Sequence, residues 1–191
     1  MDNVNNFRDY ASYKSIRTIP YDVINYLAIN CPDLWKLLKY ENPMGKSDLS
    51  QEEIKGMIAP SSMHLENYNV AFQKFSDEAM TSDKGEVFSQ LRIQVLNGYS
   101  QDTQVAKVNI LLQIIVNNRK MICDTDQVAY DNRATAIMQE LVDALNGKPL
   151  YDNGRYLFLN GLEDYSGGFK LVNFNNEYSG YNLIMTTIVS D

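Results

Sequence analysis

The stretch KVNILLQIIV, residues 107–116, decides the fold. One set of alternate positions in this stretch contains its polar residues, Lys107, Asn109 and Gln113. The opposite set is aliphatic throughout: Val108, Ile110, Leu112, Ile114 and Val116. A period of two with many β-branched residues predicts a strand that buries one face. A helix is the alternative for an apolar run of this length, but the nine residues 108–116 with this period favour the sheet.

Further strands are predicted on both sides of this one. Leu91, Ile93 and Val95 alternate with Arg92 and Gln94, and NGYSQDT (residues 97–103) then turns the chain back as a hairpin. Later in the chain, three more segments have strand character: RYLFLNG (155–161), GGFKLVNF (167–174) and GYNLIMTTIVS (180–190). The short links between these segments favour antiparallel neighbours.

One amphipathic helix is predicted over residues 131–146. Asp131 is the expected cap, and Asn146 and Gly147 end the helix, because glycine adopts the left-handed closing conformation. Pro149 then prevents the helix from resuming. The expected buried stripe is apolar: Ala134, Ile137, Met138, Leu141 and Leu145.

Shorter helices are predicted near the N-terminus. One follows Pro20, and a second carries Trp35, which we expect in the core, and cannot continue far past Pro43. A third begins at Ser50, whose side chain forms a capping box with Glu53.

These patterns predict an α+β fold, with the 131–146 helix packed across a mainly antiparallel sheet. Residues 1–19 are expected to form a flexible N-terminal arm that orders against a neighbour. Residues 20–191 form a single α+β domain with a long loop at about 60–85, a length typical of a binding surface.

Composition narrows the class of protein. The 191 residues are 45% hydrophobic and 21% charged, as in one soluble globular domain. We expect neither a membrane span nor a signal peptide. The net charge is −7, from 17 basic and 24 acidic residues, and the basic residues are scattered, which argues against sequence-specific binding of nucleic acid. Cys31 and Cys123 have no CxxC spacing, so reduced, buried thiols are expected rather than a disulfide.

No catalytic, cofactor-binding or metal-binding residue is predicted, and the chain is not expected to be an enzyme. His64 is the only histidine and is expected on a surface loop. DTDQVAYD (124–131) departs from a calcium loop where glycine and the final acidic ligand are required, so its aspartates are expected to solvate a turn and cap the next helix. NGKPL (146–150) is a helix stop rather than a phosphate loop, and the adjacent Glu163 and Asp164 point to opposite faces.

Several segments together resemble phage neck proteins, specifically the tail-terminator or head-to-tail connector family. They span roughly residues 20–191: IPYDVINYLAINCPDLWKLLKYENP, LLQIIVNNRKMICD, RATAIMQELVDALNGKPL, GRYLFLNG and YSGYNLIMTTIVSD. Within this pattern, the family's arginine, apolar stripe and helix stop fall on Arg133, Leu145, Asn146, Gly147 and Lys148.

The resemblance implies a structural virion protein, assembled in the host cytoplasm as a homo-oligomeric ring at the phage head-to-tail junction. Its partners would be the portal or other neck and tail proteins, and an acidic lumen would pass DNA without binding it. A non-catalytic cellular protein-binding module and a small enzyme remain alternatives. Within phage biology, an all-helical adaptor and a small-barrel stopper also remain open.

Overall fold

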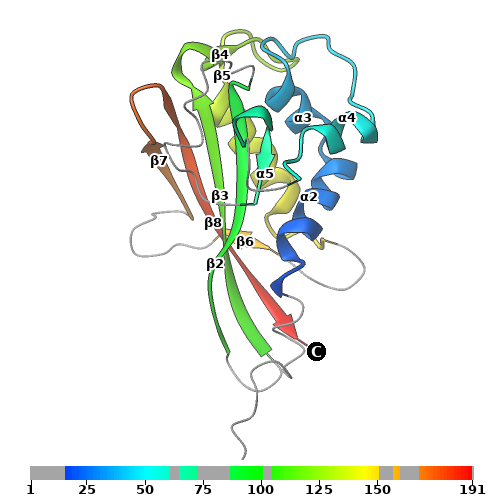
Figure 1. The fold of residues 1–191 in the computed structure, drawn as a ribbon, viewed down its shortest axis with the longest axis vertical. Coiled ribbons are helices and arrows are strands. Elements are labelled where there is room, and N and C mark those ends of the chain that lie inside the picture. Colours follow the sequence, from blue (N-terminus) through cyan, green and yellow to red (C-terminus); the bar gives the residue numbers. More distant parts are fainter. Residues whose placement is uncertain are drawn as a thin grey trace, which may run out of the picture.

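A computed structural model describes residues 16–60, 65–72, 87–100, 105–150, 157–159 and 168–190. Within these residues, one sheet has helices packed on one of its faces (Figure 1). Its strands are β1 Val70–Ala71, β2 Ser89–Ser100, β3 Val105–Asn117, β6 Phe158–Leu159, β7 Phe169–Asn173 and β8 Tyr178–Ser190. The helices are α2 Ile19–Asn30, α3 Pro32–Lys39, α4 Gln51–Gly56 and α5 Arg133–Leu145. A separate two-stranded ladder joins β4 Ile122–Cys123 to β5 Asp131–Asn132.

The sheet is mostly antiparallel, which confirms the predicted mixed α+β class. Its strand order is β1-β2-β3-β8-β6. β7 also pairs with β8, so β8 has both β6 and β7 as partners. β2, β3 and β8 are 12 or 13 residues long, and together they extend beyond the helices (Figure 1). β1 is the exception, because it runs parallel to β2. Part of the expected 60–85 loop, residues 61–64 and 73–85, lies outside the described residues.

The hairpin between β2 and β3 turns later than predicted. Residues 97–100 pair with β3, with a register shift between Val95 and Asn97. Asn97 and Gly98 form a strong local turn signal. Here β3 is long enough to pair with them, and pairing across the sheet overrides the local preference.

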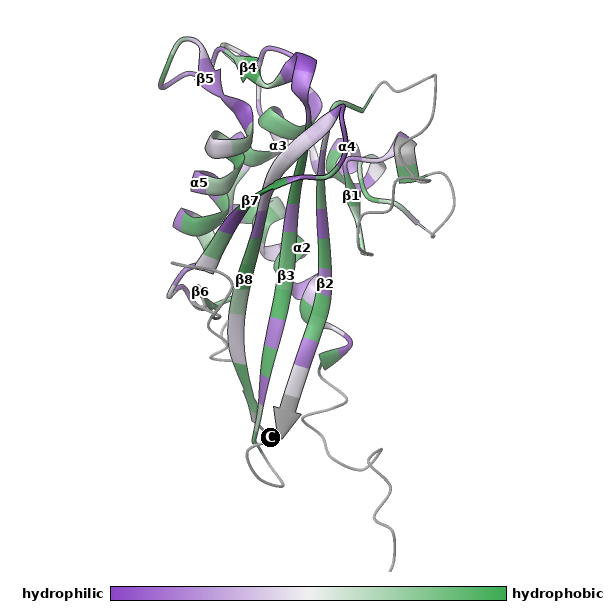
Figure 2. Cartoon of the chain, turned by 90° about the vertical axis from the view of Figure 1, so that its left-hand side faces the viewer, coloured by the Kyte–Doolittle hydropathy of each residue, from purple (hydrophilic) through white to green (hydrophobic). Residues whose placement is uncertain are grey.

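β3 is buried on both faces, whereas the sequence predicted one buried face. Ile110, Leu112 and Ile114 are fully buried and belong to the main hydrophobic core. The opposite face, which looks away from α2 in Figure 2, carries Asn109 and Gln113, and both are 5% exposed or less. Asn109 accepts a hydrogen bond from the hydroxyl of Thr186 at 2.7 Å, and the Gln113 amide donates to Asn182 at 3.0 Å. These bonds offset the cost of burying polar side chains.

The helices cover the apolar face of the sheet. The sequence predicted one long helix and shorter N-terminal helices. In the structure α5 has 13 residues and α2 has 12, so these two helices are nearly equal in length. The capping box of Ser50 and Glu53 is present, as predicted. Trp35 is fully buried, as expected, and its indole donates to the carbonyl of Leu27 at 3.0 Å, which joins α3 to α2. Gly147 ends α5 with φ of +68°, as predicted.

The cap of α5 is not the residue that the sequence indicated. Asp131 belongs to β5, and Asn132 is the cap residue. The side-chain oxygen of Asn132 accepts a hydrogen bond from the backbone N–H of Thr135 at 3.0 Å. α5 begins at Arg133, so Asp131 lies two residues before the helix, one position too early for its side chain to cap it.

Arg133 fixes the end of α3 against the start of α5. Its side chain is fully buried and donates to the carbonyls of Leu37 at 2.6 Å and Tyr40 at 2.9 Å. It also donates to the carbonyl of Glu41, and to that of Lys120 at 2.9 Å. Carbonyls at a helix end have no partners within the helix, so one buried guanidinium satisfies several of them at once.

Candidate functional site

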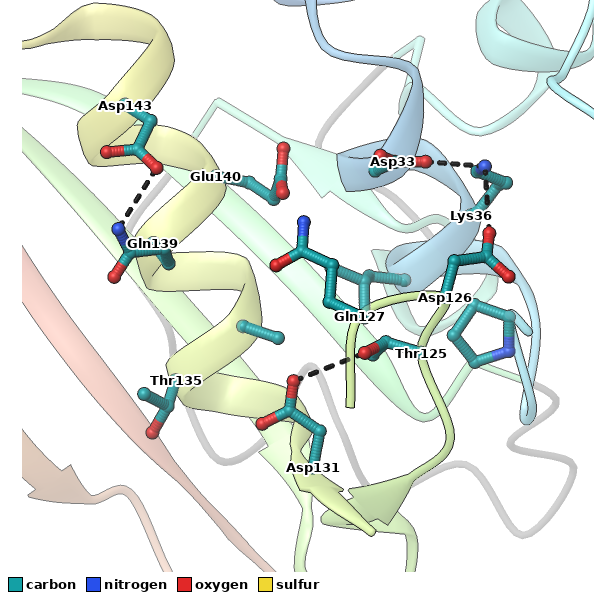
Figure 3. A pocket seen from close by; sticks show the side chains of 13 residues that line it. Asp33, Lys36, Thr125, Asp126, Gln127, Asp131, Thr135, Gln139, Glu140 and Asp143 are labelled. Atoms are coloured by element: carbon teal, nitrogen blue, oxygen red, sulfur yellow. Dashed lines mark hydrogen bonds and ion pairs between the residues drawn. The ribbon is translucent and has the colours of Figure 1, made fainter. Parts of the chain in front are cut away.

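The cavity between α3, α5 and the loop 124–131 is the candidate site (Figure 3). Its volume is about 330 Å³. The charged side chains on its wall are Asp33, Lys36, Asp126, Asp131, Glu140 and Asp143. Five carboxylates thus face one amine, and we call this the acidic cavity.

Lys36 links α3 to the loop 124–131 at the acidic cavity. Its side chain is only 9% exposed, and its amine lies 2.5 Å from Asp33, 3.4 Å from Asp48 and 3.7 Å from Asp126. The hydrogen bond to Asp33 is the main reason that the pKa of Lys36 is raised. Asp33 lies one turn earlier on α3, whereas Asp126 comes from the loop, so the ammonium group holds the loop against the helix.

Glu140 lies on the opposite wall and contacts a thiol. The Sγ atom of Cys31 donates to Oε2 of Glu140 at 3.3 Å. Burial raises the pKa of the Glu140 carboxyl. Burial is also the main reason that the pKa of Cys31 rises to about 12, with the Glu140 charge adding to it. A thiol with this pKa is almost entirely protonated at neutral pH, so Cys31 acts as a hydrogen-bond donor rather than a nucleophile.

The aspartates of the loop organise its turn, as the sequence predicted, whereas the predicted capping of the next helix by an aspartate is wrong, because Asn132 is the cap. Asp124 accepts a hydrogen bond from the backbone of Tyr130 at 2.9 Å. Asp126 accepts one from the backbone of Gly45 at 2.8 Å. Tyr130 has φ of +58° and is 82% exposed, so the Asp124 carboxylate holds this unfavourable backbone geometry. No group of three or more histidine, cysteine, aspartate or glutamate residues within the described ranges could hold a metal ion.

β7 is a second feature with functional potential. It is a short outer strand, and among the described residues only β8 pairs with it. Leu171 is 64% exposed and Phe169 is 39% exposed, and the Phe169 ring meets Tyr181 edge to face at 6.1 Å. A sheet edge with exposed apolar side chains is a template for pairing with another chain.

The other residues singled out by the sequence are only partly described. Cys31 and Cys123 are both buried and free, as predicted. Arg133 is structural, and Lys148 is exposed beside the helix stop. His64, Glu163 and Asp164 lie outside the described residues.

Sequence reasoning missed the acidic cavity itself. The available signal was a pair of spacings, Asp33 with Lys36 and Glu140 with Asp143, which place charges on one face of each helix. That the two faces meet depends on how α3 packs on α5 (Figure 3). Chemically, the cavity wall favours cations such as amines and guanidinium groups.

None of the helices that the structure describes is long and apolar enough to cross a membrane. No curated protein and no solved structure matches the chain. The model of one protein family, YomW, matches residues 32–187, which is most of the chain. The matched range includes the segments that line the acidic cavity, and it includes β7. The chain therefore belongs to the YomW family, a phage-derived family.

Proposed function

We propose that this member of the YomW family is a phage protein, a non-catalytic structural component of the virion that forms a ring at the head-to-tail junction. Assembly would take place in the host cytoplasm, and the ring would contact the portal or other neck and tail proteins. The observation that carries the proposal is the outer strand β7 with Leu171 64% exposed. Membership of a phage-derived family supports the setting.

The two edges of the sheet are suited to a head-to-tail contact. β7 lies on one edge, and on the other edge, within the described ranges, β1 pairs with Leu91 and Arg92 of β2 and leaves the rest of that strand uncovered. β2 and β8 run in the same direction, and β7 runs opposite to both. If neighbouring copies are related by an axis along the strands, β7 of one copy meets β2 of the next in antiparallel orientation. A repeated contact between two different surfaces closes into a ring when the rotation allows it.

The acidic cavity supports the proposed lumen. Its wall has five carboxylates and one amine, and the whole chain has a net charge of −7. A surface of this sign facing the axis would repel the phosphates of passing DNA and keep it from binding. A basic wall in an electron-microscopy map of the ring would contradict this part of the proposal.

Light scattering and electron microscopy of the purified protein test the ring. We expect a closed oligomer for the natural sequence and smaller species for Leu171→Lys, because a charge on β7 prevents apolar edge pairing. Ile122→Lys is the matched control, since Ile122 is 58% exposed and lies on β4, which belongs to the separate two-stranded ladder and not to the main sheet. A single chain under all conditions, or assembly that Leu171→Lys leaves intact, would contradict the proposal.

A protein-binding module is the second candidate, and the acidic cavity is the observation that favours it. A pocket of this charge fits a lysine or arginine side chain of a partner. An oligolysine peptide is the probe, and calorimetric titration is the measurement. Binding by a monomer that is lost in Asp33→Asn would support the module, whereas a ring that does not bind the peptide would exclude it.

A further inference from the structure

A second cavity lies away from the acidic one, between α2, α4 and β1. Its volume is about 290 Å³. Tyr21 and Phe72 form one side of it, with ring centroids 4.5 Å apart, and Tyr21 is 56% exposed. Ile24 and Ile58 add aliphatic surface, and Lys55 is the one charged residue among the described lining residues.

The framework around the second cavity is held by backbone hydrogen bonds. The N–H of Ala59 donates to the carbonyl of Val70 at 2.9 Å, and the N–H of Val70 donates to the carbonyl of Met57 at 3.0 Å. These bonds fix the segment after α4 against β1. The cavity is therefore a preformed site with an aromatic and aliphatic lining, which is the usual character of a site for apolar side chains.

The chain itself contains a segment that suits this site. Residues 1–15 precede the described part of the chain, which begins at Ile16, only five residues before Tyr21. They contain three aromatic residues at a spacing of three, Phe7, Tyr10 and Tyr13. Their charges cancel, with two aspartates against Arg8 and Lys14, so Lys55 does not repel them. A segment of 15 residues spans at most about 50 Å, which is enough to reach an adjacent copy.

We propose that residues 1–15 of each copy occupy the second cavity of the neighbouring copy, with Tyr10 against Tyr21 and Phe72. This inference rests on the proposed ring. A ring contact needs two different, complementary surfaces on the same chain, and the segment and the cavity form such a pair. With Tyr10 in the cavity, the adjacent Asp9 comes within reach of the Lys55 amine at its rim.

Disulfide trapping between two singly substituted full-length chains tests the proposal. Asp9→Cys, which keeps the Tyr10 ring, is mixed with Lys55→Cys carrying an added mass tag, and the assembly is oxidised and run on a non-reducing gel. Asp9→Cys mixed with Arg119→Cys is the control, since Arg119 is also exposed but follows β3, away from the cavity. Background from Cys31 and Cys123 is low, because both are buried with raised pKa values. We expect about tenfold more mixed dimer than in the control, because docking raises the effective concentration of the two thiols.

The outcomes separate this inference from the proposed ring. If light scattering shows a ring but the mixed dimer is no more abundant than in the control, the docking is overturned and the proposed ring stands. A chain that stays monomeric and gives no mixed dimer would overturn both. The double variant Asp9→Cys/Lys55→Cys, diluted into excess natural protein, identifies the source, because a crosslink within one chain would overturn the neighbouring copy as the origin of the segment.

Discussion

At the scale of single residues, Arg133 makes the contacts most sensitive to substitution. Arg133→Met keeps the bulk of the side chain and removes its donors, which leaves the carbonyls of Leu37, Tyr40 and Glu41 without that partner. We expect the free energy of unfolding to fall by about 3 kcal/mol or more, measured by urea denaturation. Arg119→Met, at an exposed position, is the control and should change it by less than about 0.5 kcal/mol. Equal effects at the two positions would contradict the assigned role.

Gly180 is the position where the sheet tolerates no side chain. A Cβ atom there would lie 2.1 Å from the backbone oxygen of Ile114, and φ is +157°. Gly180→Ala forces β8 away from β3, and we expect it to lower the free energy of unfolding by about 2–4 kcal/mol. Gly56→Ala has nothing within 4 Å and lies at the end of α4, so it should be neutral or stabilising by up to about 1 kcal/mol. Thermal unfolding of both variants checks the opposite signs.

Glu140 gives a dependence of stability on pH. Burial raises the pKa of its carboxyl above the unfolded value, so the folded chain holds this proton more tightly and the charged form costs stability at every pH above the raised pKa. Glu140→Gln removes that cost and still accepts a hydrogen bond from Cys31. We expect a higher melting temperature than the natural protein at pH 7, with the difference shrinking as the pH falls to about 4. A lower melting temperature at pH 7 would contradict the assignment.

At the scale of helices and strands, the cap of α5 can be tested with neighbouring residues. Asn132→Ala removes the acceptor for the N–H of Thr135, and we expect a loss of about 1 kcal/mol. Asp131→Ala at the adjacent position should cost clearly less, since the bond that its carboxylate accepts from the Thr125 hydroxyl is long, at 3.4 Å. Urea denaturation of the two variants compares them, and the reverse order would restore Asp131 as the cap.

Elements whose cause is local were predictable from the sequence. The alternation in 107–116, the capping box at Ser50 and the stop at Gly147 all depend on residues within a few positions of one another. The parallel pairing of β1, the late turn of the β2–β3 hairpin and the burial of both faces of β3 depend on partners elsewhere in the sheet. The acidic cavity and the contacts of Arg133 with Leu37, Tyr40 and Glu41 join segments more than 80 residues apart, and periodicity carries no information on such distances.

At the scale of the whole molecule, net charge should control assembly. Each copy carries −7, while the proposed contact at β7 is apolar, so repulsion between copies opposes ring formation at low ionic strength. We expect the oligomer fraction to rise as salt increases from about 50 to about 500 mM, because the screening length falls several-fold. Sedimentation velocity across this range measures it. Dissociation by salt would instead indicate that ion pairs hold the copies together.

The position of β8 in the sheet has a consequence for how the chain is made. β8 lies between β3 and the pair of outer strands β6 and β7, yet residues 178–190 are the last to be synthesised of all those that the structure describes. Thr186 meets Asn109 across 77 positions of sequence, so the middle of the sheet cannot close while residues 178–190 are still inside the ribosome. Until residues 178–190 emerge, one edge of nascent β3 keeps its backbone N–H and C=O groups unpaired beside exposed aliphatic side chains, and translation speed and chaperones become determinants of yield.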